Sequence, residues 1–153
     1  MEIRLDYMKV SPDSLQTLLK LEGYVQKSGL DQKLVELIKI RTSQINGCAF
    51  CIDMHTKDAR AMGETEQRLY LLNAWREAPF YTKSERAALA LTEAVTKISD
   101  AGVPEDIYEV TRRYFDEEQF VDLIMAINAI NCWNRMAIST GMVPGDYQPA
   151  AHK

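Results

Sequence analysis

Four residues in the first half of the chain carry side chains that could perform redox chemistry together. Cys48 and Cys51 form a CxxC pair, His55 follows the second cysteine by four residues, and Glu36 precedes the first by twelve. The pair supplies one thiol that can be ionised and a second that can close a disulfide. The imidazole is a candidate base, and a carboxylate can orient that base. The spacing therefore indicates a thiol redox site.

The residues around the cysteine pair predict a helix. Asn46-Gly47 is a strong turn signal, and the segment that follows contains no proline or internal glycine before Gly63. Cys48 is therefore expected in the first turn, where the positive end of the helix dipole favours a thiolate. At about 100° per residue the reactive groups gather on one side. The residues on that face are Cys48, Cys51, Ile52, His55 and Ala59.

The order of these residues along the helix suggests a role for each of them. His55 lies one turn beyond Cys51, so it could accept the Cys51 proton directly or through one water and leave a thiolate that attacks peroxide oxygen. Cys48 would then resolve the sulfenic acid on Cys51, and a 48–51 disulfide would form before overoxidation proceeds. Glu36 lies on the apolar-periodic segment 31–44, which can fold back antiparallel, and we interpret it as the partner that orients His55.

Other interpretations of the same four residues stay open at this point. Two thiolates, an imidazole and a carboxylate could ligate zinc, and sequence spacing alone does not exclude such a site. Structural zinc prefers ligands on turns and paired CxxC knuckles, which favours the redox interpretation. An inert, packed CxxC is a further alternative. A thioredoxin-like activity is also open, but the thioredoxin fold is not expected, because the apolar period is helical on both sides of the motif.

Composition and charge narrow the class of protein. At 153 residues, with 46% hydrophobic and 26% charged residues, the chain fits a single domain spanning residues 1–153. The net charge is −4 and the basic residues are scattered among acids, so we expect no nucleic-acid partner. No apolar stretch is long enough to span a membrane, and no secretory leader is evident. Three cysteines do not form a disulfide framework, which favours the reducing cytoplasm.

Helical patterns cover most of the chain and predict an all-α bundle of about six to seven helices. Ser11 and Pro12 begin the first of them, Thr82 and Glu85 can form a capping box, and the last ends at Gly141. The final residues, from Asp146 onward and including His152, are interpreted as a loose, solvated tail. The expected helices are 11–28, 31–44, 48–62, 66–77, 85–99, 105–114 and 116–140.

The array Glu36, Cys48, Cys51 and His55 resembles the Glu-x11-Cys-x-x-Cys-x3-His pattern of the AhpD-like alkylhydroperoxidases, within the carboxymuconolactone decarboxylase family. The similarity covers roughly residues 30 to 100, and the later INCWNRMA is similar to the closing helix of these proteins. In one position the chain departs from the pattern: the best-studied members carry a second histidine where this chain has Phe50.

The resemblance implies an all-helical AhpD-like bundle and an antioxidant peroxidase cycle. In the family the second cysteine attacks the hydroperoxide, which agrees with the role assigned to Cys51, and a reduced dithiol partner of the thioredoxin or lipoyl type regenerates the pair. It also implies a homo-oligomer, a trimer or a hexamer. No metal, flavin or haem cofactor is expected for this chemistry. The rivals are a disulfide oxidoreductase or redox sensor without peroxide turnover, and a carboxymuconolactone decarboxylase-type enzyme.

A polar stripe interrupts the apolar pattern of the last helix. It consists of Asn128, Asn131, Asn134 and Arg135, next to Trp133. The stripe is either a solvent-exposed face or a subunit interface in which the amides hydrogen-bond across a symmetry axis, and the family resemblance favours the interface. Cys132, in the same helix, is interpreted as a small buried hydrophobe rather than a third redox group.

Overall fold

The computed structural model describes residues 1–150, and all of its regular structure in that range is helical. Nine α-helices are present there, of which six are eight residues or longer, so the expected six to seven helices are a slight underestimate. The elements are α1 (Tyr7–Val10), α2 (Pro12–Lys27), α3 (Gln32–Asn46), α4 (Ala49–Ala61), α5 (Glu66–Tyr70), the 3-10 turn η1 (Leu72–Ala74), α6 (Lys83–Thr96), α7 (Ile98–Ala101), α8 (Glu105–Arg112) and α9 (Glu117–Thr140).

The segment expected as one helix from residue 66 to 77 is split into α5 and η1. After α5 the backbone makes short turn hydrogen bonds, such as Ala74 N–H to the Leu71 carbonyl at 2.9 Å, and several carbonyls of this region also bond to side chains of the following segment. The Arg68 carbonyl accepts a hydrogen bond from the Tyr81 hydroxyl, and the Arg86 guanidinium donates to the carbonyls of Trp75 (2.9 Å) and Ala78 (3.1 Å). Tertiary hydrogen bonds therefore override the local helical pattern, which periodicity alone does not reveal.

Local capping residues set most of the helix ends at their expected positions. Thr82 and Glu85 form the predicted capping box at the start of α6, and α9 ends at Gly141, which is left-handed (φ 73°). Pro12 is the first residue of α2 as expected, but Ser11 makes no side-chain cap hydrogen bond.

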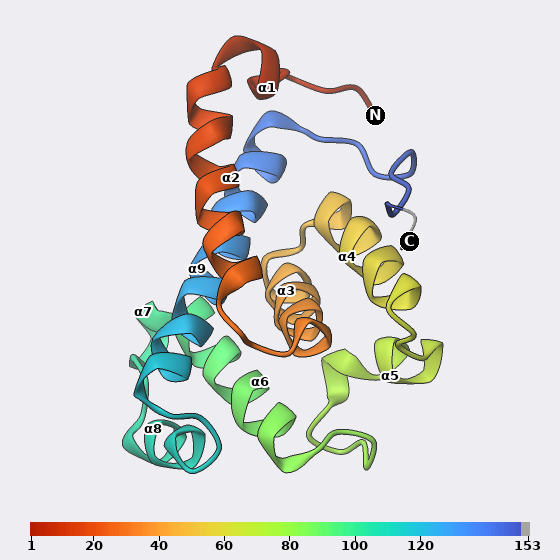
Figure 1. Ribbon diagram of the computed structural model, residues 1–153. Coiled ribbons are helices and arrows are strands. Elements are labelled where there is room, and N and C mark those ends of the chain that lie inside the picture. The colour runs from red at the N-terminus through yellow and green to blue at the C-terminus, as the bar shows by residue number, and fades with distance from the viewer. Residues whose placement is uncertain (151–153) are drawn as a thin grey trace.

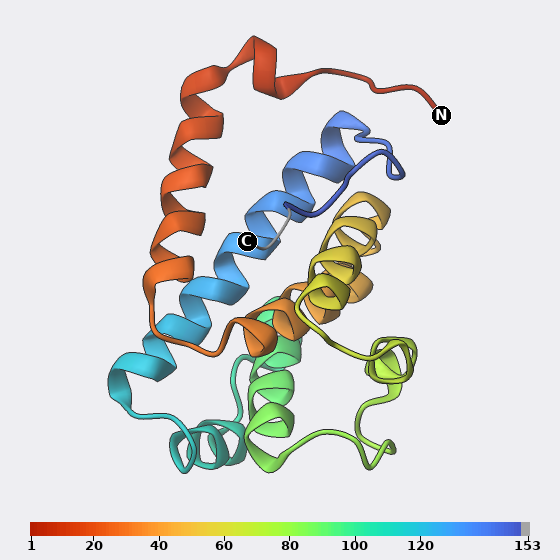
Figure 2. The same ribbon diagram turned by 45° about the vertical axis from the view of Figure 1, so that its right-hand side comes forward.

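α3 lies at the centre of the molecule and packs against α4, α6 and α9 (Figure 1). Figure 2 shows α9, in blue, running between α2, in red, and α4, in yellow. α9 is 24 residues long, and neither it nor any other helix within residues 1–150 is long and apolar enough to cross a membrane. The central position of α3 places Glu36 in the interior, between the helices that surround it.

The apolar side chains of α3 join two core clusters. Val35 and Ile38 pack with α2, α6 and α9, whereas Leu37 and Ile40 pack with α4, α5, η1 and α6. A third, smaller cluster lies between α4 and α9 and contains both Cys48 and its neighbour in the motif, Cys51. The cysteine pair is thus enclosed by apolar side chains.

Candidate active site

The two cysteines of the motif lie at the junction of α3 and α4. Gly47 ends α3 in the left-handed conformation (φ 70°), and Cys48 takes the N-cap position of α4. The Cys48 sulfur accepts a hydrogen bond from the backbone N–H of Cys51 at 3.4 Å, and the two sulfurs are 2.8 Å apart as free thiols. Both residues are 1% exposed. The predicted helix start is confirmed, and the sulfurs are already close enough to form a disulfide after a small movement.

The pKa values of the two thiols are shifted in opposite directions. Hydrogen bonds from the Cys51 thiol and from the backbone N–H of Cys51 lower the pKa of Cys48 to about 7, helped by the side chain of Asn134 and opposed by burial. The pKa of Cys51 is raised, because its proton bonds to Cys48 and because it is buried. Cys48 is therefore the more readily ionised of the two thiols near neutral pH, while Cys51 keeps its proton.

His55 is bound to Glu36, as the sequence predicted. The Nδ1 atom of His55 is 2.9 Å from Oε2 of Glu36, and the two residues are 6% and 5% exposed. Because an ionised carboxylate only accepts, Nδ1 carries the proton in this pair. The other ring nitrogen, Nε2, is buried and has no hydrogen-bond partner among the described residues. In the neutral imidazole with its proton on Nδ1, Nε2 is the nitrogen that can accept a proton, as a general base requires.

Lys39 is a member of the site that sequence reasoning missed. Its ammonium group is 3.4 Å from Oε1 of Glu36 and is also bound to Glu22, although Lys39 is only 4% exposed. Burial alone would raise the pKa of Glu36, but His55 and Lys39 outweigh it and hold that pKa below its usual range. Burial would lower the pKa of Lys39, but Glu36 and Glu22 raise it. The sequence does contain a sign of this role, because Lys39 lies three residues after Glu36 within a run of apolar residues.

The C-terminal segment also reaches the site, which corrects the expectation of a loose tail over its described part. The Tyr147 hydroxyl donates to Oδ1 of Asp58 at 2.6 Å, and Oδ2 of Asp58 is 3.9 Å from Nδ1 of His55. Burial and Asp58 together raise the pKa of Tyr147. Lys57 binds the carbonyls of Gly145 and Tyr147, each at 3.0 Å. His152, which was also assigned to the tail, lies outside the described residues.

The asparagine stripe on α9 is neither a solvent face nor a subunit interface at its two central positions. Asn131 and Asn134 are buried within the chain, and both accept hydrogen bonds from Nδ2 of Asn46, at 3.0 and 2.9 Å. Asn134 also donates to the Ser43 hydroxyl at 3.0 Å. These amides join the end of α3 to α9 next to Cys48. Both interpretations of the stripe were wrong there, because its partners lie about 85 residues away in sequence.

Comparison with known proteins places the chain in a family. Residues 12–94 match the model of the carboxymuconolactone decarboxylase family, which is more than half of the chain. The chain belongs to this family. It is 50% identical over 141 residues to the uncharacterized protein YdfG of Bacillus subtilis (strain 168), and the alignment covers 92% of this chain and 96% of that protein.

Solved structures of similar proteins agree on the fold. A protein of unknown function from Agrobacterium tumefaciens, described as a candidate antioxidant defence protein AhpD, is 45% identical, with a TM-score of 0.93 over 95% of this chain and all of that one. The debrominase Bmp8 is 21% identical, with a TM-score of 0.81, and the match covers 91% of this chain and 75% of the Bmp8 chain. At this level of identity the similarity shows the fold alone. The chain is an AhpD-like member of its family.

The site geometry of this AhpD-like protein bears on the zinc alternative. Within residues 1–150, the acidic and imidazole groups that could share an ion are Glu36, His55 and Asp58, whose ligand atoms lie within 4.8 Å of one another. Neither sulfur belongs to this group, so the four-ligand set suggested by the sequence does not converge. The ammonium group of Lys39 already neutralises Glu36. The donor set fits a proton relay better than a thiolate-ligated zinc ion.

The asymmetry of the thiol pair predicts a pH dependence. In a Cys132→Ser background we expect one thiolate to form with a midpoint near pH 7, because the pKa of Cys48 is lowered to about 7. Cys48 is protonated below this midpoint, so ultraviolet thiolate absorbance should rise as the pH rises through it. Replacing Cys48 with Ser should remove this transition. A pair that ionised only near the ordinary cysteine value of about 8.5 would contradict the assignment.

Proposed function

We propose that this AhpD-like protein is a thiol peroxidase in which Cys51 attacks a hydroperoxide, Cys48 resolves, His55 is the base and Glu36 supports it. One observation carries the proposal. Two free thiols lie 2.8 Å apart, and one turn further along α4 is a histidine whose Nδ1 is held by a buried carboxylate and whose Nε2 has no partner among the described residues. This arrangement supplies a nucleophile, a resolving thiol and a proton acceptor within two turns of one helix.

The proposed reaction begins with a proton transfer, because Cys51 is protonated at rest. Its proton passes to Nε2 of His55 directly or through one water, and the Cys51 thiolate attacks the outer oxygen of the hydroperoxide. The O–O bond breaks, and the alkoxide takes the proton from His55 to leave as an alcohol. Cys51 is now a sulfenic acid. Glu36 stabilises the imidazolium formed in between, which is the usual task of a carboxylate paired with a catalytic histidine.

The second half of the proposed cycle closes and reopens a disulfide. The Cys48 thiolate attacks the sulfur of the sulfenic acid, and the hydroxyl group leaves as water after it takes up a proton. A dithiol reductant, of the thioredoxin or lipoyl type, then supplies two electrons and two protons and restores both thiols. We further propose that the protein works in the cytoplasm as a single-domain subunit of a homo-oligomer, a trimer or a hexamer.

Simple observations distinguish two rival functions from this proposal. A decarboxylase-type enzyme of the wider family would not need the cysteines, so activity that survived loss of both thiols would favour it. A redox sensor or disulfide oxidoreductase would form the 48–51 disulfide but would not consume peroxide over many cycles. Multiple turnover of peroxide therefore separates the peroxidase from both.

Peroxide turnover is the test of the proposed function. Wild-type protein with excess dithiothreitol should consume many equivalents of cumene hydroperoxide, and the double variant Cys48→Ser/Cys51→Ser should not exceed the background reaction of dithiothreitol alone. The Cys132→Ser variant is the matched control, at a half-buried position outside the four motif residues, and it should turn over peroxide at a rate within about twofold of the wild type. Wild-type protein that leaves the peroxide intact while its thiols stay titratable would refute the proposal.

A further inference from the structure

The reactive atoms of the candidate site are closed off from solvent. Cys48 and Cys51 are each 1% exposed, and Nε2 of His55 is buried. A cavity of about 540 Å³ lies beside His55, but neither cysteine is among the described residues that line it. A molecule that reacts with either thiol therefore needs part of the surrounding structure to move first.

The segment that follows α9 covers both parts of the site. We call residues 142–150 the C-terminal strap; in Figure 1 it runs, in dark blue, from the end of α9 to the side of α4. Met142 packs against the apolar cluster that contains both cysteines of the motif. Further along the strap, Tyr147 and Pro149 line the cavity beside His55. Movement of this one segment would therefore uncover the thiols and the imidazole together.

Side chains of α4 hold the strap in place. Nζ of Lys57 donates hydrogen bonds to the carbonyls of Gly145 and Tyr147, each at 3.0 Å. The N–H of Gly145 donates to Oδ2 of Asp53 at 3.1 Å, and the same oxygen is 2.9 Å from Nζ of Lys57. The Tyr147 hydroxyl donates to Oδ1 of Asp58 at 2.6 Å. These few contacts tie the strap to the helix that carries the site.

The backbone of the strap has little support of its own. Within the described part of the chain, residues 143–150 make no backbone–backbone hydrogen bond. The N-terminal segment, whose Tyr7 lines the same cavity, is held differently, because the N–H groups of Arg4 and Leu5 both donate to the Thr140 carbonyl, at 2.9 and 3.2 Å. Segments held by a few partly exposed contacts open more often than segments tied in by backbone. Of these two covers, the strap is therefore the one that opens more readily.

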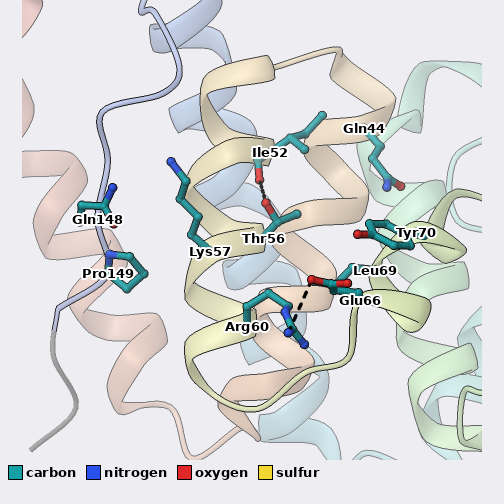
Figure 3. A pocket seen from close by; sticks show the side chains of 10 residues that line it. All are labelled: Gln44, Ile52, Thr56, Lys57, Arg60, Glu66, Leu69, Tyr70, Gln148 and Pro149. Atoms are coloured by element: carbon teal, nitrogen blue, oxygen red, sulfur yellow. Dashed lines mark hydrogen bonds and ion pairs between the residues drawn. The ribbon is translucent and has the colours of Figure 1, made fainter.

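Empty space borders the strap on two sides. Pro149 lines both the cavity beside His55 and a second hollow, of about 500 Å³, on another face of α4. Figure 3 shows Lys57 of α4 reaching toward the strap, with Gln148 and Pro149 beside it. A close-packed segment would lose many contacts when it moved, whereas this segment has few to lose. Its packing therefore favours movement of the strap while the helices stay folded.

We propose that the C-terminal strap is a gate, whose contacts with α4 break and re-form while the helices stay folded, and whose open form exposes Cys48, Cys51 and His55 to molecules in solution. The closed form protects the thiols. Lys57 is the main holding residue, because it binds two strap carbonyls as well as the carboxylate that holds the Gly145 N–H. Access to the thiols is independent of the reaction they perform, so this inference stands apart from the proposed peroxidase function.

Alkylation of the thiols measures the open form. Reduced Cys132→Ser protein is treated with iodoacetamide, and rates are compared per thiolate from an ultraviolet titration of each variant, because charge substitutions also shift thiol ionisation. When the gate opens and closes faster than alkylation, the rate follows the population of the open form. In this background Lys57→Met should react about tenfold faster, because it loses charge-assisted bonds to the strap. Tyr147→Phe, which loses one hydroxyl, should react about threefold faster.

Arg60→Met is the matched control. Arg60 lies on the same helix, carries the same charge and lines the second hollow, but it binds the carbonyl of Glu64 at 2.5 Å rather than the strap. Its alkylation rate should stay within about twofold of the parent. Equal rates in all variants, or a rise in Arg60→Met as large as that in Lys57→Met, would overturn the gate.

Limited digestion with chymotrypsin locates the opening. The full-length parent should be cut slowly after Tyr147, and Lys57→Met should be cut there faster by a factor similar to its gain in alkylation, as intact mass will show. Faster alkylation without faster cleavage at this position would place the opening elsewhere and overturn the inference. Faster alkylation and cleavage in a protein that consumes no peroxide would support the gate and refute the proposed function, so the two failures are distinguishable.

Discussion

Replacing Cys51 with serine should abolish peroxide consumption, leaving less than about 1% of the wild-type rate, since a serine hydroxyl is far less ionised and less nucleophilic than a thiol. Cys48→Ser should behave differently. It should react once with the hydroperoxide and stop at a Cys51 sulfenic acid, because the resolving thiol 2.8 Å away is missing. Peroxide loss and trapping of the sulfenic acid by dimedone, read by intact mass, measure both results.

The lower pKa of Cys48 makes this comparison informative. If Cys48 were the attacking residue, Cys51→Ser would trap a sulfenic acid at position 48, and Cys48→Ser would be inert. That reversed pattern would exchange the roles of the two cysteines without removing the peroxidase activity. A dimedone adduct on Cys132 in the wild type would instead show that the reaction does not use the motif.

Lys39→Met should lower the free energy of unfolding by about 3–5 kcal/mol at neutral pH, because removing one partner of a buried ion pair leaves an uncompensated charge. Lys39 is 4% exposed and lies between Glu22 and Glu36, so its loss leaves two carboxylates close together without their cation. Urea unfolding followed by circular dichroism measures the change. Lys33→Met, at an exposed position of the same helix, is the matched control and should change stability by no more than about 0.5 kcal/mol.

The pH dependence of this loss has a definite sign. The pKa of Glu36 is lowered in the folded wild type, so its ionised form contributes stability above the ordinary glutamate pKa, and this contribution is lost as the pH falls through the folded value. In Lys39→Met the pKa of Glu36 rises, and protonation removes the uncompensated charge. The gap between wild type and variant should therefore narrow as the pH falls from 7 to 4. A gap that widened on acidification would contradict the network.

The parts of the site that could be predicted from the sequence are those that local geometry positions. Cys48, Cys51 and His55 lie on one helix, where a spacing of three and four residues brings side chains together. Helix periodicity is enough to predict that these three side chains lie close together. The turn at Gly47, between α3 and α4, is enough to predict that the helix carrying Glu36 folds back toward them.

The remaining members of the site come from elements far apart in the chain. Tyr147 meets Asp58 across 89 residues, and Glu22 meets Trp133 across 111. Periodicity identifies a polar residue on an apolar face but does not say which partner satisfies it. For the same reason the sequence placed Asn134 on a surface, although it is buried against Ser43. The segment after Tyr70 was expected to be helical, although the Arg86 side chain binds the carbonyl of Trp75 there.

The most direct test of the central claim is to treat the reduced Cys132→Ser protein with one equivalent of cumene hydroperoxide and measure its intact mass, its free thiols and its peptides. The account predicts the loss of two hydrogens and of both thiols, with a single cross-linked peptide that joins Cys48 to Cys51. An unchanged mass with both thiols still titratable, or a disulfide that joins two chains, would contradict it.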